Sequence, residues 1–530
     1  MKSLRFIMLA AIASFMLFSC GKKDSLATAV PKDAAMVIHI DMKTLAQKAD
    51  YNLLKNDKIN AAIGVAKAYL QKEEQKKMLD DFLKDPNSLG INILSGMYIF
   101  YGADGSIGMV FSINNAKKLY DNALKIDPSF KDLIKQEGKV YSVNTPKVNF
   151  VWDNSKAVLY GNFLNSGETE PVNLLNLKAN ENFCSNANYK QFAEQKNDIS
   201  IYFSATYFGE FYKNMLDGIS EMADDSINNQ MNSVGNLISD LYKELGYSMV
   251  GGCNFEKGKI VSHGKVLFDN PNAEKKFKNL KTYNAVIKGD LNKYFTQTPI
   301  LFGAFHLNGK DALEDFNTLK ITSLIDSLSK ISKKDLNSII LKVMPVLNGD
   351  VLFSLNSVNV GNNITASFSL FAEVDTTALR PLIDDIVAKQ NTDKSIVKTD
   401  KNCWVVKQVY FGYENGIFYI SIDSIDGVTF KNGGGNPNKM IADITGQTGY
   451  FGGDFTILKE QIMKIIPQNS PYYSIADEGL GLISTFGTKA AKNKYEMTFE
   501  VNFTNKKDNA LKSIFKYIDK VITDIPLNGL

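Results

Sequence analysis

The residues best suited to chemistry are few and lie far apart. Three histidines, His39, His263 and His306, fall in strand-like segments in different parts of the chain. A zinc site needs His, Cys or carboxylate ligands at short spacing, and this sequence has no such cluster. Adjacent aspartates such as Asp80 and Asp81 point in different directions on a helix. The sequence therefore predicts no catalytic residue, no metal site and no cofactor.

Common catalytic motifs are also missing. There is no phosphate-binding G-x-x-x-x-G-K-[ST] loop, and the text closest to a nucleophile elbow, Gly246 to Gly251, is one residue too long. Ser327 and Lys330 fit an S-x-x-K pattern without its companion motifs. Carboxylates from separate elements can still meet in a folded glycosidase. A hydrolase of envelope or dietary polymers therefore stays as the alternative hypothesis.

Cys20 is the one residue for which the sequence predicts a modification. Lys2 and Arg5 precede an apolar run from Phe6 to Phe18, which is typical of a secretory signal and shorter than the roughly 20 residues of a membrane span. The segment that ends this run, Leu17-Phe18-Ser19-Cys20, resembles the bacterial lipobox, whose cysteine becomes the lipidated first residue. We expect a signal peptide over residues 1–19, membrane anchoring through lipid on Cys20, and a tether over residues 20–30.

Composition limits the partners of the remaining body. Hydrophobic residues make up 44% and charged residues 22% of the chain, which is typical of globular proteins. Without Lys2 and Arg5, the 60 basic residues become 58, against 57 acidic ones. This balance gives no basis for nucleic acid binding. Cys184, Cys253 and Cys403 are an odd number at wide spacing, so no disulfide framework is predicted. A Cys184–Cys253 bridge stays open.

Two local patterns recur along the chain. A strand followed by a helix is predicted at residues 36–49, 200–216, 285–295 and 449–466, and a hairpin followed by a helix at 97–124, 249–280, 351–389 and 482–522. Two copies add a hairpin, at 150–160 and 411–420. In the last hairpin, Met497, Phe499 and Val501 alternate with Thr498 and Glu500, which indicates a half-buried strand. We expect an α+β fold with internally repeated antiparallel sheets and packed helices, in two tandem halves over residues 31–281 and 282–530.

The repeat helps to separate structural residues from functional ones. Asp41, Asp290 and Asp454 end a strand before a helix in three copies, and such positions favour a side chain that accepts a backbone N–H. We interpret these aspartates as helix caps. The same interpretation applies to four further residues, Asn114, Asp269, Asp375 and Thr504. Trp152 and Trp404 lie in the added hairpins, where a core position is favoured over a binding face.

The lipobox, the Val30–Ala35 text before the first strand, and the tandem repeat resemble a family of uncharacterised Bacteroidota lipoproteins, catalogued as a domain of unknown function. The resemblance implies a fold and an envelope location, but no site residue. The expected function is a non-enzymatic binding or assembly role at the membrane, with an envelope protein or a glycan as candidate partner. Residues 21–24 lack the acidic run that often marks surface export, so the periplasmic face of the outer membrane is favoured.

Overall fold

The computed structural model describes residues 24–70, 72–145, 148–161, 174–220, 225–282, 285–295, 298–332, 335–360, 364–390, 395–400, 402–422, 439–491 and 495–524. The predicted signal peptide, Cys20 and the Gly433–Pro437 loop lie outside these residues.

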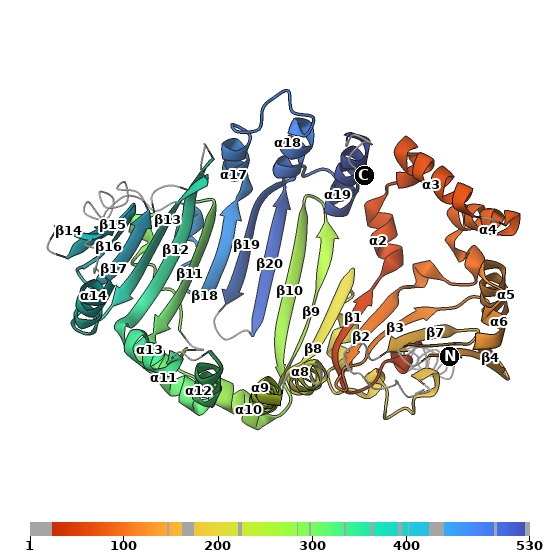
Figure 1. Ribbon diagram of the computed structural model, residues 1–530, viewed down its shortest axis with the longest axis horizontal. Helices are drawn as coiled ribbons and strands as arrows, with labels where there is room; N and C mark the ends of the chain where they lie inside the picture. Colours follow the sequence, from red (N-terminus) through yellow and green to blue (C-terminus); the bar gives the residue numbers. More distant parts are fainter. Residues whose placement is uncertain are drawn as a thin grey trace, which may run out of the picture.

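Twenty strands of the described residues form one antiparallel sheet (Figure 1). From one edge to the other, the order is β4-β5-β6-β7-β3-β2-β1-β8-β9-β10-β20-β19-β18-β11-β12-β13-β17-β16-β15-β14. The second half repeats the strand order of the first half in reverse, so that each strand βn of the first half corresponds to strand βn+10 of the second. The predicted α+β fold with two tandem halves is confirmed, and β10 pairs with β20 where the halves meet.

Ten of the described strands belong to each half. The first half contains β1 (Ala34–Ile40), β2 (Met97–Gly102), β3 (Ile107–Ser112), β4 (Ile134–Glu137), β5 (Val140–Asn144), β6 (Asn149–Trp152), β7 (Lys156–Gly161), β8 (Ile199–Ser204), β9 (Tyr247–Glu256) and β10 (Lys259–Phe268). The second half contains β11 (Leu301–Asn308), β12 (Leu347–Val360), β13 (Ile364–Val374), β14 (Ile396–Asp400), β15 (Cys403–Val406), β16 (Val409–Glu414), β17 (Ile417–Ile422), β18 (Gln447–Asp454), β19 (Ile483–Ala491) and β20 (Glu496–Phe503).

Helices follow the strands in both halves. The first half contains α2 (Met42–Ala49), α3 (Asp57–Tyr69), α4 (Glu73–Lys84), α5 (Ala116–Ile126), α6 (Phe130–Leu133), α7 (Tyr189–Glu194), α8 (Ala205–Ser220), α9 (Asp225–Leu245) and α10 (Pro271–Asn279). The second half contains α11 (Gly309–Thr318), α12 (Ile321–Ser332), α13 (Leu336–Val343), α14 (Thr376–Gln390), α16 (Lys439–Ala442), α17 (Phe455–Ile462), α18 (Tyr473–Leu482) and α19 (Ala510–Asp524).

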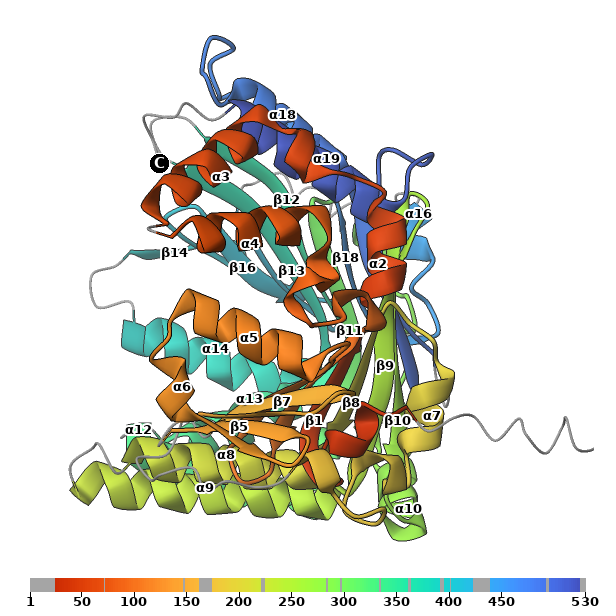
Figure 2. The same cartoon turned by 90° about the vertical axis from the view of Figure 1, so that its right-hand side faces the viewer.

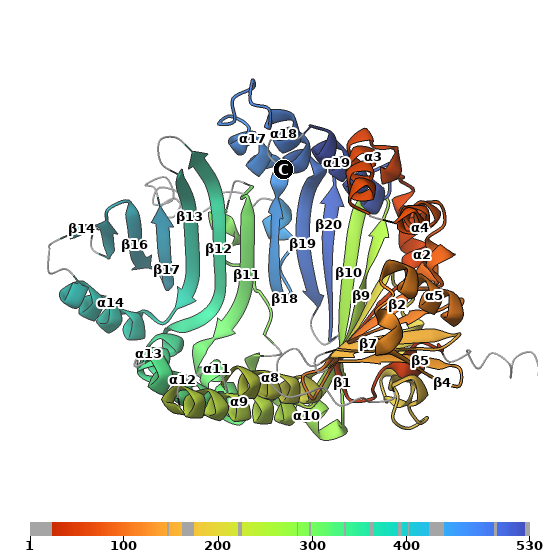
Figure 3. The same ribbon diagram turned by 45° about the vertical axis from the view of Figure 1, so that its right-hand side comes forward.

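The sheet is curved, and its two faces have different neighbours. Figure 2 shows α5 and α14 on one side of the sheet, and α7 and α16 on the other. The two ends of the sheet bend towards the side of α5 and α14, which we call the concave face (Figures 1 and 3). Helices α8, α9 and α12 follow one rim, and α17, α18 and α19 follow the opposite rim.

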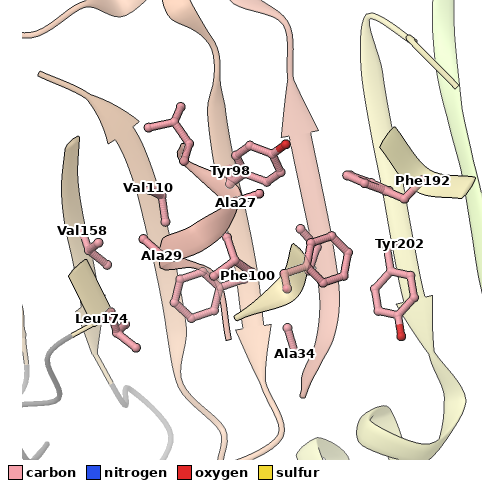
Figure 4. Packing of buried hydrophobic residues seen from close by; sticks show 14 of the residues in the cluster. Ala27, Ala29, Ala34, Tyr98, Phe100, Val110, Val158, Leu174, Phe192 and Tyr202 are labelled. Carbon is pink, nitrogen blue, oxygen red and sulfur yellow. The ribbon is translucent and has the colours of Figure 1, made fainter. Parts of the chain in front are cut away.

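The convex face of the first half is covered by its own chain. Phe100 and Tyr202 project from the strands into a buried cluster with Phe192 (Figure 4), and Val37 and Phe183 belong to the same cluster. Four residues at the start of the described chain, Leu26, Ala27, Ala29 and Val30, are buried in the same cluster. The expected tether over residues 20–30 is therefore too long, because its apolar end packs against the sheet.

The corresponding cluster of the second half corrects one predicted strand. Residues 285–290 form no strand; the first strand of this half is β11. Ile287, Leu291 and Phe295 instead pack on the convex face beside Phe302. The apolar spacing that predicted a strand therefore reflects burial of one side of an irregular segment. Asp290 is no helix cap either, because the short helix η8 (Asn292–Tyr294) starts after Leu291 without a side-chain cap.

The other predicted caps divide into two groups. Asp41, Asp454 and Asp375 accept backbone N–H groups of the helices that follow them, at 2.9–3.3 Å. Asn114, Asp269 and Thr504 do not cap, because each lies two or more residues before the first residue of its helix. Asn115, Asn270 and Asn509 accept the corresponding backbone N–H groups instead. The equivalent of Asp41 in the second half is Asn308, which accepts from Lys310 N and Asp311 N.

Candidate functional site: the open part of the concave face

The strand pairings place a row of side chains across the middle of the concave face. In antiparallel strands, directly paired residues project to the same side. Consecutive pairs give the row Ile38, Ile201, Gly251, Gly264, Met497, Ala490, Gly449, Phe305. The neighbouring row on this face is Ile40, Ile199, Cys253, Ser262, Phe499, Thr488, Phe451, Gly303. We call these sixteen positions the open face.

Large apolar side chains of the open face are accessible to solvent. The exposed fractions are 38% for Ile201, 37% for Phe305, 42% for Phe451 and 48% for Met497. Leu159 continues the first row through β3, β2 and β1 and is 38% exposed. Among the described strands, Val397 is the one other exposed large apolar residue, and it lies on the convex face. Exposure of apolar side chains is therefore concentrated on one side of the sheet.

Charge is distributed in the opposite way. None of the sixteen open-face positions is charged. On the convex face of the central strands, Lys259 lies 3.5 Å from Glu500 and Lys265 lies 3.6 Å from Glu496. His263 belongs to this convex side because it pairs with Thr498. The same strands are thus solvated on one face and apolar on the other.

Two glycines leave the middle of the open face without side chains. Gly251 and Gly264 pair across β9 and β10, between Ile201 and Met497. A Cβ on Gly251 would stand 2.2 Å from the carbonyl oxygen of His263, so no other residue fits there without a backbone shift. A glycine within a strand often marks a place where the backbone bends or comes close to a ligand.

Helices cover the two ends of the concave face and leave the middle uncovered. Trp152 packs with Ala157 beneath α5, and its Nε1 donates to the Ala116 oxygen at 3.3 Å. Trp404 packs with Val351 and Leu379 beneath α14. Both tryptophans are buried, at 1% and 6% exposure. The predicted core role of the tryptophans is confirmed, and the open face lies between them.

A polar cluster on the convex face is the second candidate site. His306, Asp350 and Glu373 place one ligand atom each within 4.8 Å of one another. His306 Nδ1 lies 2.8 Å from Asp350 Oδ1, and Glu373 Oε2 accepts the Asp350 N–H at 2.9 Å. These residues are far apart in sequence, so the spacing argument against clustered ligands missed them.

The hydrogen bonds of Asp350 indicate a structural role for this cluster. Its carboxylate is fully buried and accepts Lys288 N at 2.9 Å and Gly289 N at 2.7 Å. The carboxylate thus supplies hydrogen-bond acceptors for two backbone N–H groups in the irregular segment that includes residues 285–290, acceptors that a paired strand would otherwise supply. With these bonds and His306 in place, the oxygens are occupied, and a cation would have to displace backbone donors.

The other residues considered in the sequence analysis, namely His39, Ser327 and the three cysteines, do not join either candidate site through a catalytic or metal-binding arrangement in the described residues. His39 packs against Tyr98 with ring centroids 4.7 Å apart and ring planes tilted by 40°. Burial lowers the pKa of His39, while Asp24 and Asp41 oppose that shift. Ser327 Oγ donates to the Ser323 oxygen within α12. No disulfide joins the cysteines at 184, 253 and 403 of the described chain.

A smaller apolar pocket lies on helices of the first half. It has a volume of about 320 Å³ and is lined by Leu70, Gln75, Met78, Leu79, Phe82, Leu89 and Ile126. No described helix is long and apolar enough to cross a membrane.

The fold defines the class of protein: an α+β protein with one duplicated, curved antiparallel sheet. Residues 27–426 match the family model described as "Domain of unknown function (DUF4836)". The match spans most of the chain, and the chain belongs to this family. No curated protein sequence is significantly similar to it. A solved structure titled "Structure of crystal form I of TP0453" is similar to 50% of this chain and 88% of its own, with 8% identity and a TM-score of 0.23. An identity and a TM-score this low do not indicate a shared function.

Proposed function

We propose that this protein is a membrane-anchored lipoprotein of the cell envelope that binds an apolar partner on the open face, without catalysis. The exposed apolar rows support this most directly: Ile201, Phe305 and Met497 lie in one row, and no charged residue accompanies them. Monomeric proteins rarely leave contiguous apolar patches larger than a few hundred Å² uncovered unless something binds there.

The position of the first described residues is consistent with an anchor on the other side. Tyr98 Oη donates to the Asp24 carboxylate at 2.7 Å, and Tyr98 belongs to the convex cluster. Cys20 precedes Asp24 by four residues, a stretch of at most about 14 Å when fully extended. A lipid on Cys20 would therefore attach near the convex face, and the open face would stay available to partners in the periplasm.

The anchor is tested by metabolic labelling. Cells expressing the tagged chain are grown with radiolabelled palmitate, and Cys20→Ser serves as the variant. We expect label in the parent and none in the variant, together with release of the variant from membranes. Equal labelling of both would contradict lipidation at Cys20.

Binding at the open face is tested by crosslinking in intact cells, followed by affinity recovery and mass spectrometry. Met497→Asp places a charge in the exposed row, and Thr498→Asp places the same charge on the opposite face of the strand. We expect a recurrent partner with the parent and with Thr498→Asp, and its loss with Met497→Asp. A partner recovered equally with all three proteins would place binding elsewhere.

A hydrolase of envelope or dietary polymers is the second candidate, because the fold brings Asp350 and Glu373 together beside His306. Asp350 is fully buried, so substrate contact would need movement of the segment at Lys288 and Gly289. Turnover of a polymer that Glu373→Gln abolishes would favour this candidate over a binding role.

A further inference from the structure

The polar groups of the open face are all engaged within the protein. Ser262 and Thr488 are its two hydroxyl residues. Ser262 Oγ donates to the Gly252 oxygen at 3.0 Å, while Thr488 Oγ1 accepts Phe451 N at 2.7 Å and lies 3.2 Å from the Phe451 oxygen. Burial raises the pKa of the Cys253 thiol, which therefore stays uncharged at neutral pH.

Most backbone N–H and C=O groups of the same strands are engaged in pairing with neighbouring strands. Strands β8, β9, β10, β20, β19 and β18 are each paired on both sides. A peptide or glycan lying on this face would lose hydrogen bonds to water without replacement, at a cost of about 1–3 kcal/mol for each buried group. A hydrocarbon loses none and gains about 0.8 kcal/mol for each buried CH₂ group.

We infer that the partner of the open face is a hydrocarbon chain, the acyl chain of a lipid-type amphiphile. This inference rests on the proposed binding function and names the chemical class of the partner. It follows from complementarity: the face is apolar, uncharged and without free hydrogen-bonding groups, which matches an alkyl chain and no polar polymer.

The dimensions of the row fit this partner. From Ile201 to Phe305 the row crosses six strand spacings of about 4.8 Å, or about 29 Å. The two opposed acyl layers of a bilayer together span about 30 Å, so one chain needs about half the row. Gly264 lies between Ile201 and Met497 and is partly exposed, so a chain could contact the strand backbone there, whereas the neighbouring Gly251 is buried.

Photo-crosslinking in cells tests the chemical class directly. A benzophenone amino acid replaces Met497 in the full chain, and the matched control replaces Thr498, the next residue on the opposite face. We expect adducts of lipid mass at position 497 and none at 498. Protein adducts at 497, including a second copy of this chain, would overturn the acyl-chain inference and leave the proposed binding function standing. No adduct at 497 would overturn both.

A binding assay gives the size of the effect. The chain with Cys20→Ser, which removes the expected lipid, is titrated with 11-(dansylamino)undecanoic acid. We expect saturable fluorescence, at least tenfold weaker binding for Met497→Lys, and less than a twofold change for Thr498→Lys. Circular dichroism checks that both variants fold. Equal binding by the two variants, or none by the parent, contradicts the inference.

Discussion

The convex and concave faces of the central sheet belong to the same strands but differ in how far the rest of the chain covers their apolar side chains. On the convex face, Val37, Tyr202 and Phe302 are buried under segments of the same chain, and the exposed strands β10 and β20 bear ion pairs. On the concave face, Ile201, Phe305 and Met497 have neither cover nor charge.

This difference teaches where to look for function. The three histidines, His39, His263 and His306, and the buried Asp350 lie on the convex face. There they are engaged in packing, ion pairs or hydrogen bonds that stabilise the fold. The sixteen open-face positions hold no histidine and no charged residue. Their exposed apolar area is nevertheless unfavourable by roughly 25 cal/mol per Å², which makes this face the better candidate for a binding surface.

The largest expected effect separates the two faces on one strand. Phe302 is 0% exposed on the convex side of β11, and Phe305 is 37% exposed on the concave side. Phe302→Ala should lower the free energy of unfolding by about 3–5 kcal/mol, because it opens a cavity. Phe305→Ala should lower it by less than about 1 kcal/mol. Urea titrations of both variants measure the difference; similar losses would mean that the concave face is part of a packed core.

The buried carboxylate should give the next largest effect. Asp350→Ala leaves the N–H groups of Lys288 and Gly289 without acceptors, and we expect a loss of about 2–4 kcal/mol. Asp350→Asn retains one acceptor oxygen and should lose less. Thermal denaturation with and without added divalent cations provides the readout. A large cation-induced stabilisation that Asp350→Asn removes would instead favour a metal site.

The glycine pair should give a smaller effect. Gly251→Ala places a Cβ 2.2 Å from the His263 oxygen, and the required backbone shift should cost about 1–3 kcal/mol. In Gly264→Ala the nearest atom is Met249 Cε at 3.7 Å, so stability should stay within about 1 kcal/mol of the parent. Binding of the dansyl probe should then change for Gly264→Ala while stability does not. Unchanged binding would move the ligand away from this part of the row.

The smallest effect concerns pH and the convex face. Burial lowers the pKa of His39 below its ordinary value of 6.5. The unfolded chain therefore binds the proton at higher pH than the folded protein does. His39 contributes stability above pH 6.5 and loses it as the pH falls below that value. His39→Gln should reduce the decrease in melting temperature between pH 7.5 and pH 5.5, and an identical pH profile would contradict this account.

Local sequence patterns predicted much of the fold. Period-two alternation at Met497, Phe499 and Val501 identified β20, and the strand before Asp41 and its helix were confirmed. Residues 285–290 were predicted wrongly, because an apolar pattern records burial and not the hydrogen-bonding partner. Their partner, Asp350, lies about 60 residues later in the chain.

The sequence by itself determined that this chain builds a duplicated α+β body of alternating strands and capped helices. It determined this because side-chain alternation and helix capping are local properties. The tertiary structure alone decided which apolar side would be covered. Segments 26–30 and 287–295 pack on the convex face, while α5 and α14 cover only the ends of the concave face. The order of strands sets that outcome, since it places Ile201, Met497 and Phe305 in one row from distant parts of the chain.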